Sequence, residues 1–502
     1  MGIESEYGIA AVGAPEFDPM ALSNAVVRAW QDRVGQDRAG DRWDYSTETP
    51  LQDSRGFEVS RARAHPSQLT DDQTMANTVL TNGARFYVDH AHPEYSGPEC
   101  TSATDAVRFD TAGDLIAYRA AVRAGESLGL PVRLWKNNTD GKGAAYGTHE
   151  NYLTPRTVGF HQYVRHFTTH LVTRQIFTGN GRVGLGQDSE EPGYQLSQRA
   201  DFFEAEVGLE TTIRRPIINT RDEPHADARH YRRLHVITGD ANRSEYATWL
   251  KLGTAQLVLA AIGAGAFDQT GDRLQLSEPV AAMHQISHDP SLQAQAELAG
   301  GRVASALELQ RELWEVCSSW LDGATDLTDA DRAEYEQIRT EWAAILTDLA
   351  ADPMSCADRL DWVAKLALLE RYRSRDQLAW DHPKLALVDL QYAELDPQRS
   401  LYQALVRSGR MRRLTTDAEV EAAIETAPID TRAWFRGECV RRYGAQVIAA
   451  SWDSVVFDVP GGRSYVRVPM DDPFRGTRAA VAELLDRSPD VRSLLVGLEA
   501  IR

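Results

Sequence analysis

Polar and apolar residues alternate at the start of the chain, where residues 3–11 place Glu4 and Glu6 on one side and apolar or small residues on the other. A period of two residues is typical of a strand with one buried face. Apolar residues at helical spacing follow over residues 19–32. The pattern therefore predicts a strand that carries two carboxylates on one face, followed by a helix.

The rest of the chain changes character several times. Residues 35–73 are rich in charge, proline, glycine, serine and threonine, which predicts a long loop of the kind that is uncommon in compact domains unless it is functional. Strands and helices mix over 84–218, and apolar spacings of three and four predict mainly helices over 244–369. Short strands are predicted again in a small C-terminal domain, 426–502, which follows a large domain, 1–425.

Composition narrows the class of protein. A chain of 502 residues with 42% hydrophobic residues can bury a large core, which excludes a short binding module. The four cysteines form no CxxC pair, so neither a disulfide framework nor a zinc ribbon is expected, and a reducing cytoplasm is the natural location. No apolar stretch approaches 18 residues and the formal net charge is −19, so we expect neither membrane insertion nor general nucleic-acid binding.

The most informative segment is a strand-like run over residues 84–90. One face of such a strand carries a cation, a phenol and a carboxylate: Arg85, Tyr87 and Asp89. The opposite face carries Phe86, Val88 and His90. Together with Glu94 and the two glutamates of the first strand, several carboxylates could converge on a hard cation that requires oxygen ligands. An ordinary half-buried strand with interchangeable polar residues stays an alternative.

A second polar cluster lies in the glycine-rich run 136–151. Its glycines allow backbone amides to approach a ligand, and His149 and Glu150 offer further metal or proton chemistry. Arginines and a histidine further along the chain could clamp phosphates: Arg199, Arg233, His235 and Arg436. Simple turns and surface ion pairs are the alternatives for these residues.

Two familiar nucleotide motifs are excluded. The glycines at 179, 181 and 184 match the dinucleotide fingerprint, but the residues that follow cannot open a helix for a pyrophosphate. The run Asp-Gly-Lys-Gly at 140–143 lacks both the Walker glycine spacing and a serine or threonine after the lysine. Neither a Rossmann site nor a P-loop is therefore expected.

Five longer motifs resemble the family of enzymes that attach and remove the prokaryotic ubiquitin-like protein Pup: residues 2–9, 82–96, 221–227, 233–242 and 451–455. The resemblance spans the whole chain. It implies an α+β fold, in which a glutamine-synthetase-like large domain with a curved, mainly antiparallel sheet cradles ATP and Mg²⁺, beside a small C-terminal domain.

The resemblance also implies roles for individual residues. Those that carry over directly are the Mg²⁺ ligands Glu4, Tyr87 and Glu94, the ATP contacts Arg85 and Trp452, and the catalytic Asp89. Glu6 and His149 are implied as additional metal ligands in or near the nucleotide site. Three further residues are implied to contact the nucleotide: Arg199, His235 and Arg436. One departure is Gly97, which stands where the ligases carry an ATP-contacting threonine.

Two features separate the removing enzymes from the ligases of this family. The segment 35–73 resembles an insertion of the depupylases that the ligases lack, and His90 stands in a motif where ligases tend to carry Gly-Ser. The resemblance therefore implies an ATP- and Mg²⁺-dependent Pup deamidase and depupylase. Its partners would be Pup and pupylated proteins, with the proteasomal ATPase ring as a further candidate.

Three alternatives stay open from the sequence: a Pup–protein ligase, a catalytically silent Pup-binding adaptor and a glutamate–cysteine ligase. The intact set of carboxylates around Asp89 speaks against an adaptor, because an adaptor needs no metal-bound aspartate. The length of the Pup-related motifs speaks against a glutamate–cysteine ligase. For Asp89 itself, nucleophilic attack on the amide carbonyl and activation of a water are both open.

Overall fold

The computed structural model describes residues 1–14, 16–31, 42–60, 75–211, 214–270, 272–461 and 464–500. Parts of the predicted long loop, at 35–41 and 61–73, lie outside these residues. The part of the loop that is described contains short elements: β3 (Arg42–Trp43), the 3-10 turn η2 (Tyr45–Thr47), β4 (Gln52–Asp53) and β5 (Phe57–Glu58).

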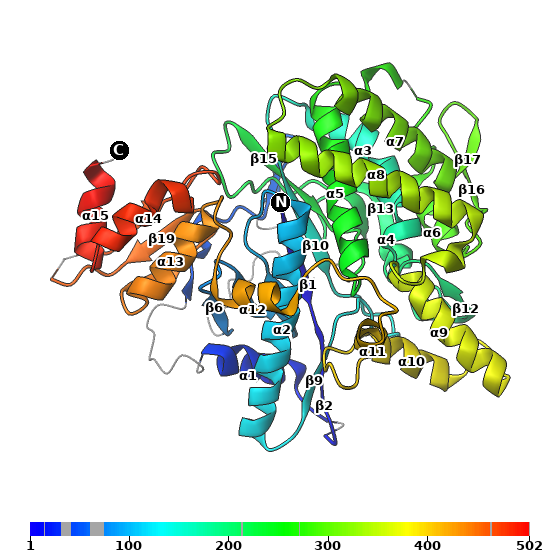
Figure 1. Cartoon of the computed structure of the whole chain (residues 1–502), viewed down its shortest axis with the longest axis horizontal. Coiled ribbons are helices and arrows are strands. Elements are labelled where there is room, and N and C mark those ends of the chain that lie inside the picture. The colour runs from blue at the N-terminus through cyan, green and yellow to red at the C-terminus, as the bar shows by residue number, and fades with distance from the viewer. Residues whose placement is uncertain are drawn as a thin grey trace.

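A six-stranded antiparallel sheet lies at the centre of the molecule (Figure 1). Its strands run in the order β15 (Tyr231–Val236), β10 (Thr148–Pro155), β1 (Gly2–Glu6), β8 (His92–Ser96), β7 (Arg85–Asp89) and β6 (Asn77–Val79). The chain leaves β1 through Tyr7 into β2 (Gly8–Ala11), which pairs with β9 (Val132–Trp135). The predicted first strand is thus present as two consecutive strands, and the prediction of a mainly antiparallel sheet is confirmed.

Helices cover one face of this sheet, which we call the reverse face. The predicted first helix, α1 (Pro19–Gln31), packs on β7 and β8, α2 (Ala103–Leu128) packs on β1 and β8, and α5 (Glu245–Gly263) packs on β10 and α2. Buried apolar side chains such as Phe86 and Leu234 point into this core. None of the helices in the described ranges is long and apolar enough to cross a membrane.

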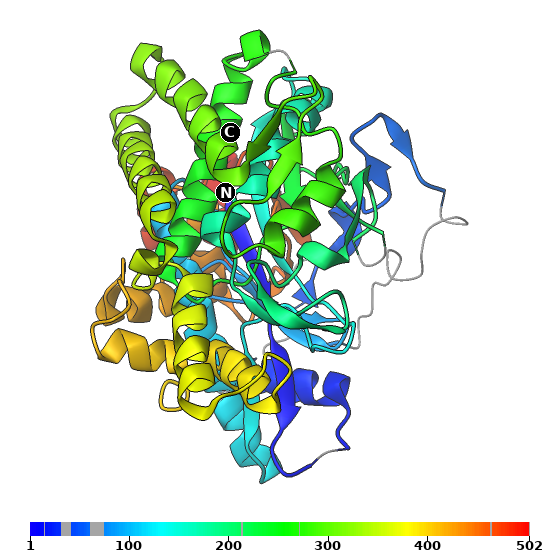
Figure 2. The same ribbon diagram turned by 90° about the vertical axis from the view of Figure 1, so that its right-hand side faces the viewer.

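The middle of the chain is mainly helical, as predicted. Its helices are α3 (Phe160–Thr173), α4 (Gln175–Thr178), α6 (Pro279–Ser287), α7 (Ala306–Gly323), α8 (Asp329–Ala351), α9 (Asp361–Asp376), α10 (Pro383–Ala393), α11 (Leu401–Arg407) and α12 (Asp417–Glu425). Three small sheets accompany them: β11 (Arg182–Leu185) with β12 (Glu191–Gln195), β13 (Phe203–Gly208) with β14 (Arg215–Asn219), and β16 (Gln295–Glu297) with β17 (Val303–Ser305). Figure 2 shows the hairpin β4–β5, in blue, on the side of the molecule away from α7 and α8.

The C-terminal part has a hydrophobic core of its own. It is built from α13 (Ala433–Tyr443), β18 (Val447–Ala450), β19 (Ser454–Phe457), β20 (Val466–Pro469), α14 (Arg478–Arg487) and α15 (Val491–Ala500). The predicted strands are present, but three helices accompany them. Strand β3, from the described part of the predicted long loop, joins this sheet parallel to β18, and Trp43 is buried in its core. The domain boundary at residue 425 stays a prediction.

Candidate active site

Polar side chains from neighbouring strands meet on the front face of the large sheet, opposite the helices. The antiparallel register sets Glu6 opposite Glu94 and Glu94 opposite Tyr87, which makes one row across β1, β8 and β7. A second row reads, from β10 to β7, His149, Glu4, Ser96 and Arg85. Because side chains two positions apart share a face, the alternation predicted from the sequence places both rows on the same side.

Three carboxylates of this face come close together. Oxygen atoms of Glu6, Asp89 and Glu94 all lie within 4.8 Å of one another. Two ionised carboxylates at that separation repel by roughly 3.5 kcal/mol at an effective dielectric constant of about 20. Burial, and then the charges of Asp89 and Glu6, raise the pKa of Glu94 well above its usual range. A compact set of oxygen donors under mutual repulsion fits a hard cation such as Mg²⁺.

Glu4 lies beside this cluster in a polar group of its own. Its carboxylate accepts a hydrogen bond from Asn151 Nδ2 at 3.0 Å and lies 3.2 Å from Nδ1 of His149. Burial alone would raise the pKa of Glu4, but His149 and then Arg233 outweigh it, and the pKa is lowered. The ring of His235 lies 4.9 Å from that of His149, and burial together with Arg233 lowers the pKa of His235 well below its usual value. His235 is therefore a neutral imidazole.

Asp89 is the last residue of β7, and its neighbour His90 departs from the predicted arrangement. His90 was predicted to share a face with Phe86 and Val88, which is wrong because the strand ends one residue earlier, at Asp89. His90 adopts a left-handed backbone with φ 52°, and its Nδ1 lies 3.0 Å from Asp89 Oδ1. Contact with Asp89 raises the pKa of His90 to about 9. Burial would raise the pKa of Asp89, but His90 lowers it, so Asp89 is ionised.

Arg85 is enclosed by aromatic rings. Its guanidinium carbon lies 3.7 Å from the ring centre of Tyr87, 4.2 Å from that of Trp43 and 5.5 Å from that of Tyr45. Arg85 Nη2 also donates a hydrogen bond to the Tyr45 hydroxyl at 3.0 Å. Trp43 in turn meets Trp452 edge-on at 5.1 Å. The segment 42–58 thus connects the two residues that were predicted to contact ATP.

Arg436 lies behind Trp452 and is fully buried. Its Nε donates to the carbonyl of Gly83 at 2.9 Å, its Nη1 donates to the carbonyl of Trp452 at 3.0 Å, and its Nη2 bonds to Glu99. Burial opposes the charge of Glu99, but Arg436 and Arg432 outweigh it and lower the pKa of Glu99 to about 2. Arg436 therefore holds the Trp452 backbone in place.

Trp452 also lines a cavity of about 110 Å³ next to the metal-binding candidates. Glu4 and Arg233 lie on its wall, and Phe474 adds a second aromatic surface. An aromatic side chain, a cation and a carboxylate are groups that recognise the base, the phosphates and the cation of a nucleotide, but a volume of about 110 Å³ is below the roughly 300–1,000 Å³ of a typical ligand pocket. Glu4, Asn151 and Arg233 belong both to the wall of this cavity and to the polar group around Glu4.

Arg199 is buried near Glu6. Its Nη1 donates to the carbonyl of Ile237 at 2.5 Å. Burial, and then the charge of Arg215, lower the pKa of Arg199 to about 10, while Glu6 acts in the opposite direction. Among the residues that the structure describes, its Nε has no hydrogen-bond partner. This arginine therefore keeps an unused donor close to the carboxylate cluster.

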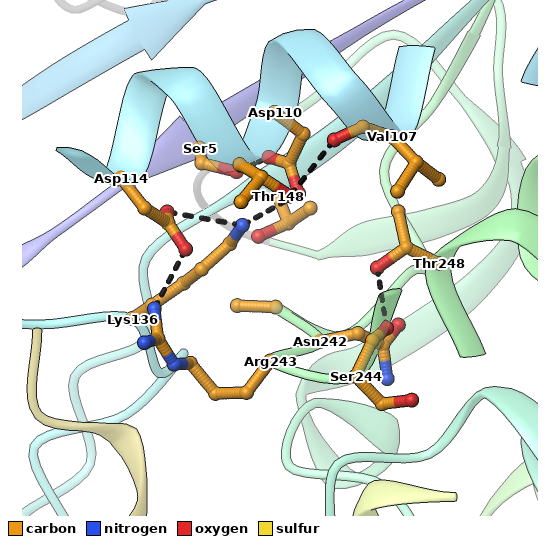
Figure 3. Close-up of polar contacts among 12 residues, drawn as sticks. Ser5, Val107, Asp110, Asp114, Lys136, Thr148, Asn242, Arg243, Ser244 and Thr248 are labelled. Carbon is orange, nitrogen blue, oxygen red and sulfur yellow. Dashed lines mark hydrogen bonds and ion pairs between the residues drawn. The ribbon is translucent and has the colours of Figure 1, made fainter. Parts of the chain in front are cut away.

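Two residues of the predicted glycine-rich cluster lie elsewhere. Glu150 is fully buried on the reverse face, where it pairs with Arg174 at 2.6 Å and accepts a hydrogen bond from Tyr152 at 2.6 Å. Lys136 is buried behind β1, between two carboxylates of α2 (Figure 3). Strand alternation explains the result for Glu150, because His149 next to it faces the front.

Sequence reasoning missed several residues that shape the site. Asn151 stands two positions after His149 on β10, so strand alternation alone could have found it. Trp43 and Tyr45 reach Arg85 from the predicted long loop, and Glu99 reaches Arg436 across the boundary between two cores. No local pattern signals these contacts, because each joins segments that are far apart in sequence.

Comparison with known proteins gives a consistent result. Residues 1–456 match the model of the family described as Pup-ligase protein. The chain is 52% identical to the depupylase of Acidothermus cellulolyticus, over 99% of this chain and 98% of the relative. It is 50% identical to the Pup deamidase/depupylase of Mycobacterium tuberculosis, over 100% and 99%, and 39% identical to the Pup–protein ligase of Micrococcus luteus, over 82% and 89%.

Solved structures agree with these sequence matches. The ligase PafA in its complex with Pup aligns with a TM-score of 0.79 at 32% identity, covering 100% of this chain and 94% of that one. The ligase PafA in complex with ADP aligns with a TM-score of 0.74 at 34% identity, covering 86% and 96%. The predicted fold class is confirmed by these alignments.

Proposed function

The chain belongs to the Pup-ligase protein family, and from this premise we propose that it is a depupylase and Pup deamidase. It hydrolyses the isopeptide bond between the C-terminal glutamate of Pup and a substrate lysine, and it converts a C-terminal glutamine of Pup to glutamate. Support for this choice over ligation comes from the higher identity to depupylases, 50–52%, than to ligases, 36–39%.

Both reactions share one chemistry, because both bonds join the γ-carbonyl carbon of the last Pup residue to a nitrogen. Water adds across that bond: its hydroxyl oxygen ends on the carbonyl carbon, and its protons leave with ammonia or with the lysine amine. An amide carbonyl is a poor electrophile. The site must therefore supply a nucleophile or base, stabilise an oxyanion and protonate the leaving nitrogen.

The observation that carries the proposal is the position of the Asp89 carboxylate, which has an oxygen within 4.8 Å of carboxylate oxygens of Glu6 and Glu94. Two routes are open to it. Asp89 attacks the carbonyl and forms a transient anhydride that water then opens, or it removes a proton from the water that attacks. His90, held in its protonated form beside Asp89, keeps this carboxylate ionised.

We assign a resident Mg²⁺ and nucleotide to the front face of the sheet. The residues that would hold Mg²⁺ are Glu4, Glu6, Tyr87, Glu94 and His149. Those that would hold ATP are Arg85, Arg199, His235 and Trp452, with Arg436 as the support of Trp452. When bound, Mg²⁺ would supply positive charge that offsets the repulsion among the carboxylates and polarises the carbonyl of Pup.

Partners and location follow from the same proposal. Pup and pupylated proteins are the substrates, and the reaction takes place in the cytoplasm, where the four buried, unpaired cysteines stay reduced. The proteasomal ATPase ring stays a predicted partner. Pup–protein ligation is the competing function, and the two activities differ in whether ATP is consumed with each turnover.

The proposal is tested by hydrolysis in H₂¹⁸O. Purified protein, ATP and Mg²⁺ are incubated with a Pup conjugate or with glutamine-ended Pup, and the products are analysed by intact mass. We expect free Pup that carries one ¹⁸O in its terminal γ-carboxylate. In a single turnover, label in Asp89 identifies an anhydride that water opens at the Asp89 carbonyl, whereas label in Pup alone fits both direct attack by water and an anhydride opened at the Pup carbonyl. Absence of labelled Pup after many turnovers with both substrates contradicts the proposal.

A further inference from the structure

A cluster of four charged side chains lies directly behind strand β1. Asp110 and Asp114 come from α2, Lys136 follows β9, and Arg243 precedes α5 (Figure 3). Lys136 Nζ lies 2.6 Å from Asp110 and 3.1 Å from Asp114, and Arg243 Nη1 lies 2.6 Å from the other oxygen of Asp114. Lys136, Asp110 and Arg243 are 1%, 4% and 6% exposed, and the side chain of Asp114 is 16% exposed, so two cations balance two anions with little access to solvent.

Two hydroxyl groups connect β1 to this cluster. Ser5 Oγ donates a hydrogen bond to Asp110 Oδ1 at 3.3 Å, and Tyr7 Oη donates one to Asp114 Oδ1 at 3.0 Å. Both residues are fully buried. Ser5 stands between the two glutamates of β1, and strand alternation sends its side chain to the reverse face. On the reverse side of the sheet, the hydroxyls of Ser5 and Tyr7 thus bond to carboxylates of α2. On the front side, the neighbouring residues Glu4 and Glu6 are metal-binding candidates.

An ionic cluster is not the most stable way to fill this space. Moving each charge out of water costs several kcal/mol, and well-packed apolar side chains are often as stable or more so. Other parts of the reverse face are apolar, with Phe86, Val88 and Leu234 in the core, although the buried pair of Glu150 and Arg174 also lies on this face. A buried network whose hydrogen bonds and charges are all paired can instead hold the surrounding backbone in one defined conformation.

A single geometry is needed on the front face. The carboxylates of Glu6, Asp89 and Glu94 lie within 4.8 Å of one another on three adjacent strands, and their repulsion acts to separate those strands. A shift of one residue in β1 would turn both of its glutamates away from the site. The hydrogen bonds of Ser5 and Tyr7 to Asp110 and Asp114 oppose both the separation of the strands and the shift of β1.

We propose that the cluster of Asp110, Asp114, Lys136 and Arg243 is a positioning network for the cation site. The network accepts hydrogen bonds from Ser5 and Tyr7 and so fixes the orientation of β1 in the sheet. That orientation sets the distance between the carboxylates of Glu6 and Glu94. The network acts through the strand and not by contact with the cation. This inference rests on the cation site of the proposed function, and it goes further by assigning a role to residues on the other side of the sheet.

The test removes the hydrogen bonds of Ser5 and Tyr7 without leaving a buried charge unpaired. In the full-length chain, Ser5→Ala is combined with Tyr7→Phe, and binding of Mn²⁺ alone is measured from the paramagnetic resonance of the free ion. We expect the Kd for Mn²⁺ to rise roughly tenfold, the effect of losing two ordinary hydrogen bonds. In the depupylation assay, excess Mg²⁺ should restore most of the turnover of the double variant.

The matched control is Tyr246→Phe. It removes a tyrosine–carboxylate hydrogen bond of 2.8 Å to Glu341, between α5 and α8 and away from β1. The Kd of this variant for Mn²⁺ should stay within about twofold of wild type, because its lost bond does not touch the sheet. Thermal unfolding of all variants shows whether any change in affinity follows stability alone.

Two results would overturn the inference: a folded double variant that binds Mn²⁺ as tightly as wild type, or an equal loss of affinity in the control. If the double variant does not fold, Tyr7→Phe alone carries the same comparison. Wild-type protein that binds no Mn²⁺ would instead contradict the cation site itself, and this inference with it. The two failures are therefore distinguishable.

Discussion

Replacing Glu99 by glutamine removes the negative charge that holds two buried arginines beside the cavity lined by Trp452. Glu99 bonds to Arg432 Nε at 2.7 Å and to Nη1 of Arg436 at 3.2 Å, with a further bond to Nη2. These contacts lower the pKa of Glu99 from 4.5 to about 2. At about 1.4 kcal/mol for each pKa unit, the pairing stabilises the folded chain by roughly 3 kcal/mol at neutral pH.

The sign follows from the direction of the shift. A folded-state pKa below the unfolded value means that the stabilisation is complete above pH 4.5 and is lost as the pH falls toward 2. At neutral pH, Glu99→Gln should therefore lower the free energy of unfolding by roughly 3 kcal/mol. Because Arg436 then loses its partner, its hold on the Trp452 carbonyl weakens, and we expect the Kd for ADP to rise as well.

The assay is urea denaturation at pH 7 followed by tryptophan fluorescence, with ADP affinity measured by calorimetry. Glu312→Gln is the matched control, because Glu312 forms a surface ion pair with Arg302 at 2.6 Å. Exposed pairs of this kind contribute at most about 1 kcal/mol. A loss in Glu99→Gln that is no larger than the loss in the control would refute the reasoning.

Three further predictions concern single substitutions. Asp89→Asn should lower turnover by roughly a thousandfold while the Kd for ADP stays within about threefold, and an active variant would remove Asp89 from the mechanism. Trp43→Ala should raise the Kd for ADP by roughly fivefold, since Arg85 loses one wall of its aromatic enclosure; an unchanged Kd would contradict this role. Arg174→Met should cost about 3–5 kcal/mol in unfolding experiments, because it leaves Glu150 buried and unpaired, and wild-type stability would exclude that pairing as a stabilising contact.

Strand alternation was sufficient to predict the front face of the sheet. Arg85, Tyr87 and Asp89 share that face as their spacing of two residues requires, and Glu6 meets Glu94 because β1 and β8 pair in register. The same rule failed at His90, because the end of a strand depends on the turn that follows it. Alternation therefore predicts which residues of a strand share a face, but not where the strand ends.

Other parts of the site depend on contacts that no local pattern encodes. Trp43 reaches Arg85 because β3 packs against β6 and pairs with β18 at the other end of the chain. Lys136 lies in a run whose glycines are typical of ligand-binding loops, yet it is buried in ion pairs behind the sheet. The difference is set by tertiary packing, which brings α2 against this segment.

The most direct test of the proposed function offers both reactions to the same preparation. Purified protein with ATP and Mg²⁺ is incubated with a Pup conjugate and, separately, with glutamate-ended Pup and a lysine-bearing acceptor, and both mixtures are followed by gel, intact mass and ADP formation. We predict release of free Pup and unmodified protein from the conjugate, and no new conjugate in the second mixture. Formation of new conjugate with stoichiometric accumulation of ADP would contradict this function and identify a ligase.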